Sequence, residues 1–161
     1  MNILKQNIYQ VGTKHWERKY FDELIPLPDG TSYNAYIVKG SQKTALLDTV
    51  DPDTTRGLID NLVNERIDHI DYLVAHHAEQ DHSGSIPDIL LLYPDAKVVT
   101  NAKCKDMLID LLDIDPEKFI TIDDGKTLSL GDKTLQFIFT PWVHWPETFC
   151  SYLVEDNILF S

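Results

Sequence analysis

Apolar and polar residues alternate in the first part of the chain in a pattern that predicts β-strands. Residues 8–11 alternate, and segments 33–38 and 43–48 are rich in the β-branched, aromatic and aliphatic residues of buried strands. A short connection that contains Gly40 joins the last two segments, which predicts a hairpin. Residues 12–32 are polar and aromatic around a Pro-Leu-Pro-Asp-Gly turn, and we expect them to form a loop.

The apolar spacing changes in the middle of the chain to that of amphipathic helices. The expected helices run from Asp53 or Thr54 to about Ile67, from about Ser85 to Leu92, and onward from Asn101, which can act as an N-cap. Their predicted apolar faces contain Leu58, Ile59, Leu62, Val63 and Ile67 in the first helix, and Met107, Leu108, Leu111 and Leu112 in the third. Strands are expected between them at residues 70–75, 96–100 and 119–122.

The last part of the chain returns to strand patterns. Residues 127–130 and 134–139 form one predicted hairpin, and residues 150–154 and 158–160 form another. Prolines bracket the loop at 140–147 that lies between the two. Hairpins, then alternating strands and helices, then hairpins again predict an α+β or mixed α/β fold, with a mixed sheet and helices on one outer side. A length of 161 residues fits one domain, residues 1–161.

Composition narrows the range of partners. The net charge of −12 disfavours nucleic acid and anionic membranes, because both are bound through basic patches. Two cysteines, Cys104 and Cys150, are too few for a secreted disulfide framework, so we expect a reducing, cytoplasmic location. The longest apolar run, residues 89–93, is too short to span a membrane.

The candidate chemistry lies where the strand at 70–75 ends. His77, Glu79 and Asp81 are spaced two apart, so in an extended loop their side chains point the same way. His82 follows directly, and His144 lies in the proline-bracketed loop. Histidine and carboxylate together suit a first-row transition ion, and the share of oxygen donors favours iron or manganese over zinc.

The alternative is that these are ordinary surface polar residues of an acidic protein. That alternative has to explain three histidines and two carboxylates within the seven positions from His76 to His82. His76 itself falls out of register with the alternating set, so packing or hydrogen bonding is the favoured role for it. His15 and His69 are interpreted as solvated or structural.

The sequence from His77 to Gly84 reads His-x-Glu-x-Asp-His-Ser-Gly and resembles the flavodiiron proteins, a di-iron family with the metallo-β-lactamase fold. Zinc hydrolases of that fold carry a second histidine where this chain has Glu79. Segments 30–36, 46–50 and 140–147 are also similar to the family, so the resemblance covers essentially the whole chain. One departure is Glu147, where the family normally has aspartate; it lies beside the loop and does not change the number of ligands.

The resemblance implies a metallo-β-lactamase-like arrangement of layers, an incomplete αββα sandwich, with a site for two non-haem irons. It implies that His77, Glu79 and His144 bind one iron and that Asp81, in some members with His82, binds the other. Glu79 as a hard anionic ligand favours iron.

The resemblance also implies roles around the ligands. Asp48 would orient a ligand through a hydrogen bond, with an ordinary aspartate at a strand end as the alternative. Trp145 and Trp142 could line the site or face a flavin; for Trp142, packing beneath a loop is favoured. The family's bridging aspartate, its final histidine and its flavodoxin-like domain lie beyond Ser161. The chain is therefore expected to be the N-terminal part of the di-iron domain, with FMN supplied by a missing domain or a partner subunit.

The implied activity is reduction of dioxygen to water or of nitric oxide to nitrous oxide, with electrons from FMN. A head-to-tail homodimer and a rubredoxin-type electron donor follow from the same resemblance. The rival hypotheses are a zinc-dependent hydrolase of the same fold, against which Glu79 argues, a non-catalytic di-iron oxygen sensor, and a purely structural domain.

Overall fold

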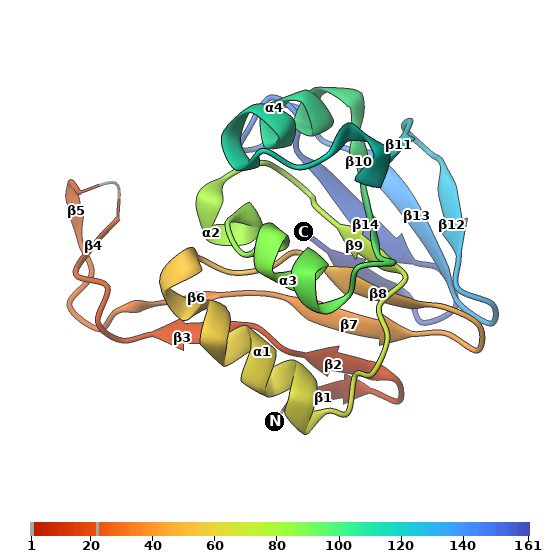
Figure 1. Cartoon of the computed structure of the whole chain (residues 1–161), viewed down its shortest axis with the longest axis horizontal. Coiled ribbons are helices and arrows are strands. Elements are labelled where there is room, and N and C mark those ends of the chain that lie inside the picture. Colours follow the sequence, from red (N-terminus) through yellow and green to blue (C-terminus); the bar gives the residue numbers. More distant parts are fainter. Residues whose placement is uncertain (1, 22) are drawn as a thin grey trace.

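The computed structural model describes residues 2–21 and 23–161, in which two sheets pack together and helices cover one side (Figure 1). The larger sheet has the strand order β1-β2-β7-β8-β9-β10-β11. Its strands are β1 (Asn2–Lys5), β2 (Ile8–Gln10), β7 (Tyr36–Lys39), β8 (Thr44–Leu47), β9 (Tyr72–Val74), β10 (Lys97–Asn101) and β11 (Phe119–Ile122). The four-stranded sheet contains β12 (Thr127–Ser129), β13 (Thr134–Phe139), β14 (Phe149–Leu153) and β15 (Ile158–Phe160) in that order.

The direction of the strands in the larger sheet decides where the loops gather. Strands β8, β9, β10 and β11 are parallel to one another, whereas β1, β2, β7 and β8 pair antiparallel. The loops that follow β8, β9 and β10 therefore leave the sheet at the same edge, which is the usual place for a ligand site in sheets of this kind.

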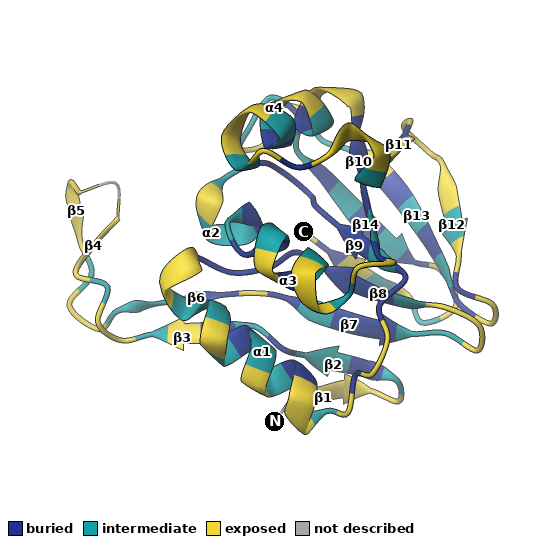
Figure 2. Cartoon of the chain, viewed as in Figure 1, coloured by how far each residue is buried: buried dark blue, intermediate teal, exposed yellow. Residues whose placement is uncertain are grey.

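The helices form a layer on one face of the larger sheet (Figure 1). They are α1 (Thr55–Asn64), α2 (Gln80–Ser83), α3 (Ile86–Leu92) and α4 (Ala102–Leu112), with the 3-10 turns η1 (Pro52–Thr54) and η2 (Pro116–Lys118). Side chains alternate across each strand, so Leu46 packs into the core beneath the helices while Leu47 packs into the core between the two sheets. Figure 2 shows the resulting buried band along the central strands.

These layers confirm the expected mixed sheet with helices on one outer side. Helix, sheet and sheet are three of the four layers of an αββα sandwich. On the outer face of the four-stranded sheet, Ile138 and Leu159 are 39% and 55% exposed, so no described element covers these side chains. The hairpins predicted at 127–139 and 150–160 are present as β12–β13 and β14–β15.

The region predicted as a loop at residues 12–32 is the main error in the element assignment. It contains β3 (Thr13–His15), which pairs with β6 (Thr31–Tyr33), and β4 (Tyr20–Phe21), which pairs with β5 (Ile25–Pro26). The β4–β5 ribbon projects from the body of the molecule (Figure 1). Its strands are only two residues long and both are exposed, so they carry no alternation of buried and exposed positions that the sequence could reveal.

Two helix predictions also need correction. Helix α1 ends at Asn64 and not near Ile67, because Arg66 adopts a left-handed backbone with φ of 52°. Val63 and Leu111 were assigned to apolar faces, yet they are 66% and 61% exposed. Each lies at the margin of its helix's buried stripe and so remains in solvent.

In the part of the chain that the structure describes, no helix combines the length and the apolar character needed to cross a membrane.

Candidate metal centre

Three consecutive strand ends build the candidate site at one edge of the larger sheet. Asp48 follows β8, the segment 76–79 follows β9, and Asn101 ends β10. The loop 140–147 between β13 and β14 reaches the same place from the second sheet. The amide of Phe149, at the start of β14, donates to the carbonyl of His76 over 3.1 Å and so joins this loop to the segment after β9.

One group of potential ligands contains His77, Glu79 and His144. One ligand atom from each lies within 4.8 Å of the other two. Glu79 Oε2 is 2.5 Å from His144 Nε2 and 3.4 Å from His77 Nε2, so this carboxylate stands between the two rings. His77 is buried, whereas the His144 side chain is 57% exposed, so the group opens to solvent on the His144 side.

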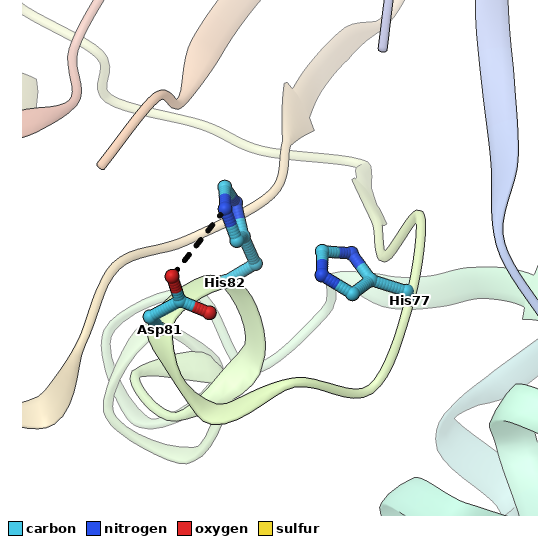
Figure 3. A group of neighbouring side chains, drawn as sticks. All are labelled: His77, Asp81 and His82. Carbon is cyan, nitrogen blue, oxygen red and sulfur yellow. Dashed lines mark ion pairs between the residues drawn. The ribbon is translucent and has the colours of Figure 1, made fainter. Parts of the chain in front are cut away.

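A second group contains His77, Asp81 and His82, again with one atom each within 4.8 Å (Figure 3). Asp81 Oδ2 lies 3.8 Å from His82 Nε2, too far for a hydrogen bond. Among the described residues, Asp81 Oδ1 and His82 Nδ1 are buried without a hydrogen-bond partner. Buried polar atoms rarely remain unpaired, so these atoms indicate a place where another group binds. His77 belongs to both groups and is therefore the centre of the arrangement.

The sequence argument for convergence was partly wrong in its geometry. Residues 80–83 were expected to lie in a loop but form the single helical turn α2. Glu79 is extended, with φ of −60° and ψ of 138°, and stands at the N-cap of that turn. Asp81 and His82 are therefore directed by a helical turn and not by strand-like alternation.

Burial perturbs the pKa values of two members of the site. Burial, followed by the nearby His82, lowers the pKa of His77 despite the opposing carboxylates of Asp48, Glu79 and Asp81. Burial, followed by the charge of Glu79, raises the pKa of Asp81 despite His82 and His77. Both shifts favour the neutral form of the group. A neutral imidazole is ready to bind a metal, and a bound cation would favour the ionised form of Asp81 that burial disfavours.

Asp48 lies behind the ligands. Its backbone is left-handed, with φ of 57°, and its two carboxylate oxygens accept from the backbone and the ring of His76. Oδ2 is also 3.8 Å from His82 Nδ1. Burial alone raises the pKa of Asp48, but the charge and hydrogen bonds of His76 and the charge of His82 together lower it overall. The hydrogen bonds to His76 confirm the hydrogen-bonding role predicted for that histidine; the orienting role of Asp48 toward a ligand stays a prediction.

The two tryptophans of the loop at 140–147 differ in environment. Trp145 is half-buried, and its ring centroid lies 6.3 Å from both the His77 and the His144 rings. Trp142 was favoured as a packing residue, which is wrong, since it is 75% exposed and its ring contacts Lys103 Nζ at 5.5 Å. Its positive φ of 67° belongs to a tight turn in which the Trp142 amide donates to the Trp145 carbonyl.

A cavity of about 580 Å³ opens beside the second group of ligands. It is lined by Glu79, Asp81, Trp145, Leu112, Tyr33, the Arg18–Asp51 ion pair and others. This volume is within the range of small-molecule sites. Arg18 and Asp51 were not singled out from the sequence, because no local pattern relates two residues that the fold pairs across 33 positions.

Glu147 has a larger role than a residue beside the loop. It is 3% exposed, its Oε1 accepts from the amide of Ala78 over 3.0 Å, and its carbonyl accepts from Asn101 Nδ2 over 2.6 Å. It therefore ties the His144 loop to the segment between His77 and Glu79. It is not a member of either ligand group, as expected.

Replacing Glu147 by alanine is expected to lower the free energy of unfolding by about 2–3 kcal/mol, because the buried Ala78 amide loses its acceptor and a cavity remains. Glu147→Gln keeps an acceptor oxygen and should cost less than about half as much. Urea unfolding of both variants measures this. Equal losses would show that the hydrogen bond to Ala78 contributes nothing.

The donors fit a first-row transition ion. Three imidazoles and two carboxylates converge, and both cysteines lie outside the two groups. Of the three buried side-chain polar atoms in the described residues that have no hydrogen-bond partner, two belong to Asp81 and His82 of the second group, and the third is Glu147 Oε2. Two neighbouring groups of donors are the arrangement expected where two ions lie near each other.

Helices on a two-sheet core, with histidines and carboxylates clustered at the strand ends, define the metallo-β-lactamase-like class. Residues 31–161 match the model described as "ODP family beta lactamase", and the chain belongs to this family, the metallo-β-lactamase-like domain of flavodiiron proteins.

Several named proteins are similar to this chain. The type A flavoprotein fprA of Rhodobacter capsulatus is 36% identical over 157 residues, covering 96% of this chain and 36% of that protein. The anaerobic nitric oxide reductase flavorubredoxin of Pectobacterium carotovorum is 35% identical over 161 residues, covering 98% and 32%. The rubredoxin oxygen:oxidoreductase structure from Desulfovibrio gigas has a TM-score of 0.91 at 30% identity, covering 98% of this chain and 39% of that one. The chain spans about a third of the length of the curated relatives it matches.

Proposed function

We propose that residues 1–161 are the N-terminal part of a metallo-β-lactamase-like di-iron domain, and that the protein reduces dioxygen to water or nitric oxide to nitrous oxide. The observation that carries the proposal is the position of His77, which belongs to two neighbouring groups of histidine and carboxylate donors. Relatives named as a nitric oxide reductase and as a rubredoxin oxygen:oxidoreductase support both substrates.

The residues have distinct tasks in this proposal. His77, Glu79 and His144 hold one iron, and Asp81 with His82 holds the other. The Glu79 carboxylate stands between the rings of His77 and His144, where a hard anionic donor favours iron over zinc. Two ferrous ions, when bound, supply electrons to a diatomic substrate. The cation stabilises the ionised carboxylate of Asp81, which burial disfavours, and burial of His77 favours its neutral imidazole, the form that binds a metal.

Electrons come from FMN in this proposal, and FMN belongs to a flavodoxin-like domain outside these residues or to a partner subunit. The names of the relatives, flavoprotein and flavorubredoxin, support a flavin. Trp145 is the residue that we propose faces the flavin, and its position in the lining of the cavity beside Glu79 and Asp81 supports this role. The remaining iron ligands come from a further segment of the same domain, and a head-to-tail homodimer with a rubredoxin-type donor completes the electron path. Two free cysteines fit a reducing cytoplasm.

Iron loading followed by turnover tests the proposal. The chain is incubated anaerobically with ferrous iron and in parallel with zinc, desalted, and analysed for both metals. Nitric oxide or dioxygen consumption beyond that of chemically reduced FMN without protein is then measured, with the reduced FMN as donor. Preferential retention of iron with consumption of either gas supports the proposal. Retention of zinc with ester hydrolysis favours the hydrolase, and iron with a stable oxygen adduct but no turnover favours a sensor.

A further inference from the structure

Three buried side chains, linked by hydrogen bonds, lie directly behind the segment that carries the ligands. His76 lies between Asp48 and Ser151, with Nδ1 2.8 Å from Asp48 Oδ2 and Nε2 2.7 Å from Ser151 Oγ. The three residues are 3%, 8% and 0% exposed in the order His76, Asp48, Ser151. Hydrogen bonds at this depth are protected from competition with water.

These three side chains connect the ends of two strands of the larger sheet with a strand of the second sheet. Asp48 follows β8, His76 follows β9, and Ser151 belongs to β14 in the second sheet. The backbone of His76 is fixed as well, because its amide donates to Asp48 Oδ1 over 2.9 Å and its carbonyl accepts from the Phe149 amide over 3.1 Å. Both polar groups of the His76 backbone and both ring nitrogens therefore have partners.

Aspartate, histidine and serine in this order also form the nucleophilic triad of many hydrolases. That role does not fit here. Ser151 Oγ belongs to a fully buried residue, and the His76 ring packs against Phe149 with ring centroids 5.1 Å apart. No substrate can reach the serine, so the three groups act on the fold around them and not on a substrate.

We propose that Asp48, His76 and Ser151 form a strut that positions the ligand segment before any metal arrives. His77 directly follows His76 and is the ligand shared by both groups, so the direction in which the strut holds the His76 backbone sets the direction of His77. The same Asp48 oxygen that holds the His76 ring faces His82 Nδ1 at 3.8 Å. His76 and Ser151 are thus positioning residues; their effect on metal rests on the proposed function, whereas their effect on the segment does not.

The test compares Ser151→Ala and His76→Phe with Tyr93→Phe in the 161-residue chain. Tyr93→Phe is the matched control, because it also removes one hydrogen bond, from Tyr93 Oη to the Ile67 carbonyl over 2.7 Å, but away from the site. The first measurement is amide hydrogen exchange in metal-free protein at His76 and Ala78, both of which donate hydrogen bonds to buried carboxylates. The second is the affinity for Co²⁺ and its visible absorption spectrum, well below the melting temperature.

Ser151→Ala is expected to raise exchange at these two amides by about tenfold or more and to weaken Co²⁺ binding by about 10- to 100-fold with an altered spectrum. Tyr93→Phe should change neither. Faster amide exchange with unchanged cobalt affinity would show that the strut stabilises only the fold, and would overturn its role in positioning the ligands. Unchanged exchange would overturn the strut itself. If the unmodified chain binds no Co²⁺, the ligand groups of these 161 residues do not hold a metal by themselves, while the exchange measurement still decides whether the strut exists.

Discussion

His77→Ala is expected to remove the metal held by the first ligand group, His77, Glu79 and His144. Its loss leaves only Glu79 and His144 in that group. Two donors from separate segments do not hold a transition ion as three pre-oriented donors do. Losing a residue that only supports a ligand lowers metal affinity by up to about 100-fold. We therefore expect the loss of a ligand itself to lower the affinity by more than ~100-fold.

Graded variants make this prediction specific. His144→Ala removes a donor from the first group only and should lower bound iron by about half where two ions bind. His69→Ala is the control, because that side chain is 60% exposed and its partner, Asp71, belongs to neither ligand group. Iron per chain is measured by elemental analysis after anaerobic loading. Equal iron in His77→Ala and His69→Ala would contradict the two-group arrangement.

The sequence was sufficient for the central part of the site because its chemistry is local. His77, Glu79, Asp81 and His82 lie within six positions after a strong strand pattern, so one short segment brings them together. His144 was a candidate from its loop, but its place beside His77 and Glu79 came only from the resemblance, since no periodicity relates it to a segment 65 positions earlier.

What the sequence could not provide are the contacts that cross between sheets. Ser151 bonds His76 across 75 positions, and Glu147 bonds Ala78 across 69. A serine in an alternating strand and a glutamate after a proline look like ordinary polar positions. Their burial results from the packing of the second sheet onto the first, which is a property of the tertiary structure. Helix α2 was missed for a different reason, since one helical turn is shorter than any periodicity can reveal.

Asp81→Asn is expected to stabilise the metal-free protein while weakening metal binding. The sign follows from the raised pKa of Asp81: the folded state holds the proton more tightly than the unfolded chain does. This contribution to stability is complete at pH values below the unfolded pKa and is lost as the pH rises through the folded one. At neutral pH the ionised, half-buried carboxylate therefore costs free energy, and the amide of the variant lacks that charge. The dipole of the four-residue helix α2 favours a charge at this position only weakly.

We expect a gain of up to about 1 kcal/mol without metal, which raises the melting temperature by ~2–4 °C in a chain of this size. The difference should shrink as the pH falls through the raised pKa, because the wild-type carboxylate then becomes neutral. With ferrous iron or Co²⁺ at about 100 times the dissociation constant, the order reverses, since binding adds about 2.7 kcal/mol to the wild type alone. Asp95→Asn, at an exposed position, controls for loss of a surface charge. A metal-free Asp81→Asn protein that melts below the wild type at neutral pH would show that the Asp81 charge is stabilised by its surroundings. That result would contradict the claim that the ionised carboxylate destabilises the metal-free protein and is stabilised only by a bound cation.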